Sequence, residues 1–151
     1  MPDFALKEIP PQTAATIHAV VPASEIRGVF DQGFPKLMRA VAAGGAQMVG
    51  APFGYYPRMP GDTIEVRIGI PIDREIAPQG DVESYTLPGG KAVVGTHVGP
   101  YDGLADTYRQ LAEWAQREGI GLGPAVWETY VTDPTTAPPS EWRTEIVWPV
   151  A

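Results

Sequence analysis

Residues 8–22, EIPPQTAATIHAVVP, are matched further along the chain by residues 86–100, TLPGGKAVVGTHVGP. The third residue of each stretch is a proline, Pro10 and Pro88, and the offset between them is 78 (88 − 10). Both stretches are apolar runs of the kind that forms β-strands, and each of them ends in a second proline. A match of this length predicts that the chain contains the same structural unit twice.

The match continues beyond these stretches. Tyr56 is matched by Tyr130 at an offset of 74 (130 − 56), and Pro71 is matched by Pro149 at 78 (149 − 71). Because the smaller offset appears after the first helical stretch, we expect the first helix to be about one turn longer than the second. The loop at residues 132–140 then restores the larger offset.

Two copies of about 75 residues are too few for a solenoid and instead predict one domain made of two fused half-units. We therefore expect a single domain over residues 1–151, with half-units at about 1–72 and 82–151 and a linker at 73–81. A domain with two-fold pseudo-symmetry has one seam between its halves, and ligand sites favour such seams.

Each half-unit is predicted to fold as ββαββ. One helix is expected from an N-cap at Ser24 to about Ala43, with Pro35 kinking or splitting it, and the other from an N-cap at Asp102 to Gly119. Most connections are short, which favours antiparallel pairing. The fold class is thus α+β: a pseudo-two-fold duplication with antiparallel sheets, one long helix per half and a ligand cleft at the seam. The expected strands are 4–9, 14–21, 47–56, 63–70, 82–87, 91–98, 126–131 and 142–148.

The composition and charge of the chain argue against several classes of partner and site. The chain has 151 residues, a formal net charge of −7 and no cysteine. Its 11 basic residues are scattered, whereas a nucleic-acid-binding surface needs a basic patch, so we expect no nucleic-acid partner. It lacks an apolar run long enough to cross a membrane and an N-terminal signal pattern, which predicts a cytoplasmic protein with no membrane partner. His18 and His97 lack metal-ligand spacing, and we expect neither a metal site nor a cofactor.

Glu128 is the first candidate site residue. It is the only charged residue in the strand VWETYV, residues 126–131, and alternation places it on one face with Val126 and Tyr130. A carboxylate inside an apolar wall usually has a partner, since burying it alone is costly. The alternative is a solvated glutamate at the sheet surface, paired with Arg143. In the first copy the matching residue is Gly54 (128 − 74), so the charge is present in one half only.

Aromatic residues are the second signal, because they crowd the segments on both sides of the seam. Such rings bind flat or cationic ligands, and the alternative role for each is ordinary core packing. Tyr108 and Leu111 are expected in the core. The residues that we expect to bind a ligand together with Glu128 are Phe53, Tyr55, Tyr101, Tyr130 and Trp142.

Three segments carry a family resemblance: residues 96–101 (THVGPY), 123–130 (GPAVWETY) and 145–150 (EIVWPV). With the helix between the first two, they resemble the GyrI-like family, the effector-binding domain of AraC- and MerR-type regulators. The resemblance spans nearly the whole chain. It implies a pseudo-symmetric pair of half-units with a ligand pocket at the seam, where a strand glutamate meets cationic, amphipathic compounds among aromatic rings. Glu128 resembles that glutamate, and Trp142 resembles an aromatic residue of the pocket wall.

Three functions remain open at this point. The first is a stand-alone protein that binds hydrophobic aromatic compounds, cationic ones among them, because no DNA-binding helix-turn-helix segment is attached. The second is an enzyme, since some stand-alone relatives in the family hydrolyse reactive toxins, and Glu128 would then be the catalytic residue. The third is a protein-interaction module, as the resemblance to an inhibitor of DNA gyrase implies. The ligand and the oligomeric state are left open.

Overall fold

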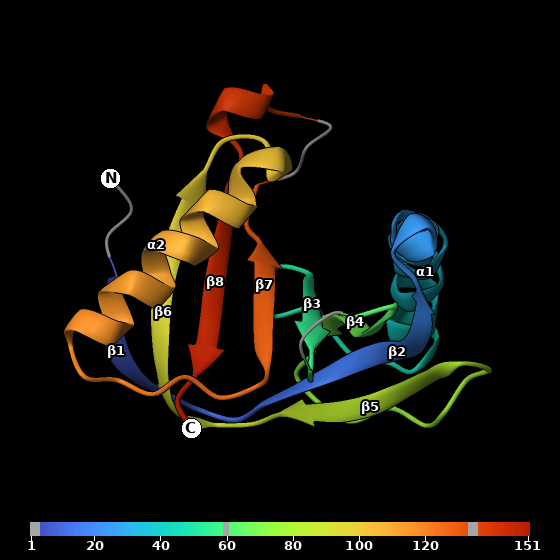
Figure 1. The fold of residues 1–151 in the computed structure, drawn as a ribbon. Helices are drawn as coiled ribbons and strands as arrows, with labels where there is room; N and C mark the ends of the chain where they lie inside the picture. Colours follow the sequence, from blue (N-terminus) through green and yellow to red (C-terminus); the bar gives the residue numbers. More distant parts are fainter. Residues whose placement is uncertain (1–3, 59–60, 133–135) are drawn as a thin grey trace.

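The computed structural model describes residues 4–58, 61–132 and 136–151, which form two ββαββ halves around one antiparallel sheet (Figure 1). The first half consists of β1 (Phe4–Ile9), β2 (Gln12–Pro22), α1 (Ile26–Ala43), β3 (Phe53–Tyr56) and β4 (Thr63–Pro71). The second half consists of β5 (Val82–Leu87), β6 (Gly90–Val98), α2 (Leu104–Arg117), β7 (Val126–Tyr130) and β8 (Arg143–Pro149). The predicted α+β class, with antiparallel pairing and two long helices, is therefore confirmed, and the strands form one sheet.

The halves exchange their first strands. The sheet has the order β1-β6-β8-β7-β3-β4-β2-β5, so that β1 pairs with β6 of the second half and β5 pairs with β2 of the first. Exchanging each strand for its counterpart reverses this order, which places the pseudo-two-fold axis between β3 and β7. Figure 1 shows the result as one bent sheet, with α2 lying across the strands of the second half and α1 beside those of the first.

The two matching prolines of the sequence lie where the exchanged strands turn. Pro10 and Pro88 join β1 to β2 and β5 to β6, and the residues after them, Pro11 and Gly89, meet. A Cβ atom on Gly89 would lie 2.7 Å from both the backbone nitrogen and Cδ of Pro11. The crossing thus requires glycine opposite the proline ring.

The helices differ in length as expected, with 18 residues in α1 and 14 in α2. Their expected N-caps are wrong: each helix is entered through a 3₁₀ turn, η1 (Ala23–Glu25) or η2 (Tyr101–Gly103), and neither Ser24 nor Asp102 caps it. Pro35 does not split α1. Because Pro35 is exposed, solvent can satisfy the carbonyl that loses its intrahelical partner.

The expected strand at 47–56 is shorter in the structure and covers only Phe53–Tyr56, with an isolated bridge between Met48 and Ile72. Pro52 has no N–H to donate to a neighbouring strand, although its carbonyl accepts a hydrogen bond from the Tyr130 backbone at 2.9 Å. Residues 57–62, which join the expected strands 47–56 and 63–70, and the loop at 132–140 lie partly outside the described residues.

Both helices cover the same face of the sheet. One row of paired residues crosses the sheet on this face: Ile17, Ile68, Gly54, Glu128 and Ile146. The first two residues of the row pack in the core beneath α1, and the last packs with Leu111 of α2. The middle of the row, at the pseudo-two-fold axis, therefore lies between the two helices.

Candidate functional site

Glu128 lies at the centre of this face, directly opposite Gly54 on β3 and next to Ile146 on β8. Its neighbours two residues away on β7, Val126 and Tyr130, point to the same face because side chains alternate along a strand. Val126 is buried with α2, whereas Glu128 and Tyr130 are half-buried. The carboxylate is therefore held between the helices rather than on the outer surface.

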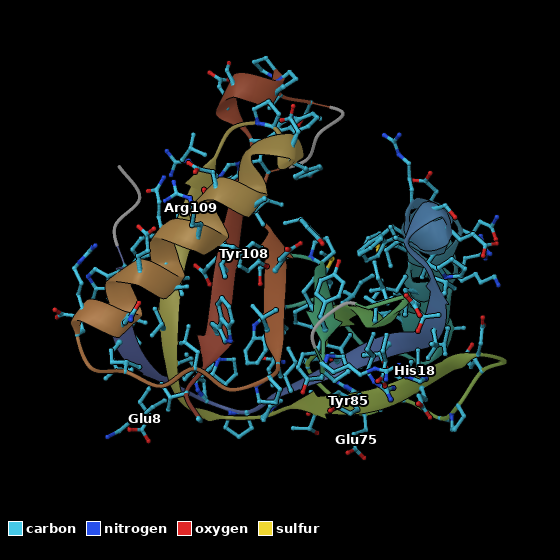
Figure 2. All side chains as sticks on the ribbon, in the orientation of Figure 1. Glu8, His18, Glu75, Tyr85, Tyr108 and Arg109 are labelled. Carbon is cyan, nitrogen blue, oxygen red and sulfur yellow. The ribbon has the colours of Figure 1, made fainter. Side chains whose placement is uncertain are left out.

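Two tyrosine hydroxyls bind the carboxylate. Tyr108 of α2 donates to Oε2 at 2.5 Å, and Tyr130 donates to Oε1 at 2.9 Å. Figure 2 labels Tyr108, which projects from α2. Burial raises the pKa of Glu128 above its ordinary value, and the two hydroxyl donors oppose that rise because they stabilise the charged form. Among the described residues, neither Arg143 nor another cation forms an ion pair with Glu128.

The hydroxyl groups around Glu128 are held in their protonated form. Burial and the nearby carboxylate raise the pKa of Tyr56, Tyr108 and Tyr130 well above the usual range. A phenol that stays protonated at every working pH can act only as a neutral hydrogen-bonding group. These tyrosines therefore offer donors to a carboxylate but no second negative charge.

A row of aromatic rings extends from this carboxylate site in both directions. Phe30 of α1 meets Tyr130 edge to face at 5.8 Å between ring centroids, and Phe34 lies 5.6 Å behind it. On the other side, Tyr101 lies 5.9 Å from Tyr130 and 5.0 Å from Trp142. Tyr101 is 39% exposed, so the row reaches the surface at its η2 end.

Of the residues predicted to bind a ligand, the structure brings Glu128, Tyr101, Tyr130 and Trp142 together. It does not bring Phe53 and Tyr55 to them. Both are buried on the opposite face, in a core that includes Trp127, and Tyr55 meets that Trp127 ring at 5.8 Å. The reason is alternation: since Gly54 shares a face with its cross-strand partner Glu128, its two neighbours must point the other way.

Three site residues were not predicted from the sequence: Phe30, Tyr56 and Tyr108. Tyr108 was expected in the core, yet its hydroxyl binds Glu128. Tyr56 is the repeat counterpart of Tyr130, and this match was a signal that the two could lie together at the axis. Phe30 carried no comparable signal, because its position depends on how α1 lies over the sheet.

The presence of the charge in one half only has a structural cause. Glu128 and its counterpart Gly54 are direct partners across the pseudo-two-fold axis. A second glutamate at position 54 would place two carboxylates opposite each other on paired strands, which is destabilising. The symmetry of the fold thus allows one carboxylate at this place, and the space over Gly54 is taken by the ring of Phe30 and the hydroxyl of Tyr130.

His97 supports the η2 end of the site. Its Nε2 donates to the carbonyl oxygen of Pro100 at 2.8 Å, and its Nδ1 lies 2.6 Å from the hydroxyl of Thr107. Because Tyr101 follows Pro100 directly, this buried histidine fixes the backbone that carries the first exposed ring. Within the described residues, no group of three potential ligands is placed to hold a metal ion.

A comparison with known protein families identifies the family of this chain. The model of the GyrI-like small molecule binding domain matches residues 2–151. None of the curated proteins searched matches the chain. No helix among the described residues is long and apolar enough to span a membrane.

Solved structures share the fold. The crystal structure of the EcmrR C-terminal domain is 24% identical with a TM-score of 0.85, and the match covers 100% of this chain and 98% of that one. The same protein in the EcmrR–DNA complex also matches (24% identity, TM-score 0.84, 99% of this chain), but the present chain spans only 57% of it.

Two more distant structures also match. SAV2435 bound to tetraphenylphosphonium is 13% identical with a TM-score of 0.64, over 99% of this chain and 94% of that one. A hydrolase from Listeria innocua is 13% identical with a TM-score of 0.70, over 98% and 91%. At such identities the likeness concerns the fold alone.

Proposed function

Because the chain belongs to the family of GyrI-like small molecule binding domains, we propose that it binds a hydrophobic aromatic compound beside Glu128. Positive charge on that compound strengthens the binding. The ligand lies against the ring row of Phe30, Tyr130, Tyr101 and Trp142, with its cationic part toward the carboxylate.

The observation that carries this proposal is a half-buried carboxylate with two phenol donors and no cation paired to it in the described part of the chain. An ionised carboxylate removed from water is costly unless a counter-charge is near. A ligand cation can supply that charge, and the surrounding rings add cation–π attraction of about 0.5–2 kcal/mol each. The tetraphenylphosphonium bound by SAV2435, a protein of the same fold, is a cation of this kind.

Glu128→Gln tests the proposal with two probes of nearly equal shape. Methyltriphenylphosphonium carries a positive charge, and triphenylphosphine oxide is neutral. We expect the variant to weaken binding of the cation by roughly 5–100-fold, or about 1–3 kcal/mol, because a half-buried pair lies between the exposed and buried limits. Binding of the neutral oxide should change less than about twofold, as measured by calorimetry.

Glu145→Gln is the matched control. It removes one formal charge from the neighbouring strand, but residue 145 pairs with Thr129 and so shares the face opposite Glu128. The control should leave both affinities unchanged. Equal weakening of cation and oxide in Glu128→Gln, or equal effects of the two variants, would contradict a role for Glu128 as the cation contact.

Hydrolysis of a bound compound is the second candidate function. It is favoured by the raised pKa of Glu128 and by the Tyr108 hydroxyl at 2.5 Å, since such a carboxyl can orient water and exchange a proton. Mass spectrometry of candidate esters and strained cyclic compounds after incubation decides between the two functions. Turnover that is lost in Glu128→Gln, with neutral binding retained, would identify an enzyme.

A further inference from the structure

The aromatic ring of Phe30 occupies the space that a side chain at position 54 would need. A Cβ atom built on Gly54 would lie 3.0 Å from Cζ and 3.3 Å from Cε1 of that ring, and 3.1 Å from the hydroxyl of Tyr130. The ring therefore rests almost directly on the backbone of β3. It does so at the residue that pairs with Glu128.

The ring of Phe30 cannot easily move farther from Glu128. Below it lies the Gly54 backbone, and behind it lies Phe34, with 5.6 Å between the ring centroids. In front of it, the edge contact with Tyr130 at 5.8 Å holds it against the residue that donates to the carboxylate. Phe30 is thus the wall that α1 contributes to the surroundings of Glu128, opposite Tyr108 of α2.

We propose that Phe30, seated on Gly54, is a specificity-determining residue that sets the largest ligand able to reach Glu128. The inference rests on the proposed function, because it concerns the same site. Since the ring is backed on two sides, a ligand must fit in the room that Phe30 leaves. Loss of the ring would open a phenyl-sized space beside Tyr130, and an added methyl group at position 54 would push the ring toward the ligand.

The test compares two cations that differ by one ring, methyltriphenylphosphonium and tetraphenylphosphonium, by calorimetry on the whole chain. We expect Phe30→Ala to shift the ratio of their affinities by about tenfold or more toward the larger cation, because a pocket that gains room for one ring gains binding surface for that ring. Phe30→Leu should shift the ratio in the same direction by less and serves as the milder variant if Phe30→Ala does not fold.

Phe4→Ala is the matched control. It also removes one phenyl ring that packs on the sheet, but this ring meets Trp114 of α2 at 6.1 Å between ring centroids and does not contact Phe30. It should leave the ratio within about twofold of the unmodified protein. Gly54→Ala should move the ratio in the opposite direction, toward the smaller cation. An unchanged ratio in both Phe30 variants, or an equal shift in Phe4→Ala, would overturn the proposal.

The outcome separates this inference from the proposed function. If the unmodified protein binds neither cation, the cationic part of the proposed function fails. The effect of Phe30 on ligand size is then measured as the ratio of the affinities for two neutral compounds, methyldiphenylphosphine oxide and triphenylphosphine oxide. A shift toward the larger oxide in Phe30→Ala supports the inference, whereas no shift, or no binding of either oxide to either protein, overturns it.

Discussion

Tyr108→Phe is expected to make the protein less stable by an amount that grows with pH. The change removes the hydroxyl that donates to Glu128 at 2.5 Å and keeps the ring, which meets Trp148 edge to face at 5.9 Å. A hydrogen bond to a charged group contributes about 1.5–3 kcal/mol. Because that bond lowers the pKa of Glu128, its loss should raise this pKa further.

The sign of the pH effect follows from linkage. The pKa of Glu128 in the folded protein already lies above its ordinary value, so its favourable contribution is present at low pH and is lost as pH rises through that pKa. Without the Tyr108 hydroxyl, the protein loses more stability as pH rises. The free energy of unfolding of the variant should therefore be lower than that of the unmodified protein by about 0.5–1 kcal/mol at pH 4, where a neutral hydrogen bond is lost. At pH 8, where a hydrogen bond to a charged group is lost, the difference should be about 1.5–3 kcal/mol.

Thermal unfolding of both proteins across this pH range measures the difference. For a chain of this size about 1 kcal/mol corresponds to roughly 2–4 °C in Tm, so the gap in Tm should widen by several degrees from pH 4 to pH 8. A carbon-13 NMR titration of the Glu128 carboxyl measures the pKa directly. Tyr85→Phe is the control. Tyr85 lies on β5 (Figure 2), and its ring contacts Arg67 and Tyr55 instead of Glu128, so no such pH trend is expected. A gap in Tm that stays constant with pH would refute the reasoning.

Two further predictions concern the fold. Gly89→Ala should destabilise the protein by about 1–3 kcal/mol in denaturant unfolding, because the new Cβ would lie 2.7 Å from Pro11, whereas Gly121→Ala, which meets only a distant alanine at 4.0 Å, should be nearly neutral. Leu37 of α1 and Leu111 of α2 are fully buried, and replacing either with alanine should lower the free energy of unfolding by about 2–5 kcal/mol. Each variant should still unfold in a single transition, since the exchanged strands join the halves; two separate transitions in calorimetry would contradict this.

Much of the fold could be predicted from local and periodic features of the sequence. The matched prolines and tyrosines predicted two ββαββ halves, and the change of offset predicted the longer first helix. These features can be found along the chain itself, as repeat offsets, alternation within a strand and helical spacing, without knowing which elements contact each other. Glu128 was recognisable for the same reason, because a single carboxylate among β-branched and aromatic residues conflicts with its local surroundings.

The arrangement of these elements depended on contacts that no local pattern encodes. The pairing of β1 with β6 and not with β2 is seen only in the register of the strands, together with the close approach of Pro11 and Gly89 where the two turns meet. Register across the axis also decides which aromatic residues meet Glu128. It turns Tyr55 to the far face and makes Gly54 the partner of the carboxylate.

The sequence by itself therefore determined the duplicated half-unit, the two helices and the one unusual carboxylate, since each depends on residue spacing along the chain. Only the tertiary structure decided that Tyr108 and Tyr130 hold this carboxylate and that Phe30 lies on Gly54. Those contacts join α1, α2, β3 and β7 across the pseudo-two-fold axis. Their geometry follows from how helices pack on a bent sheet, and spacing within any single element does not contain it.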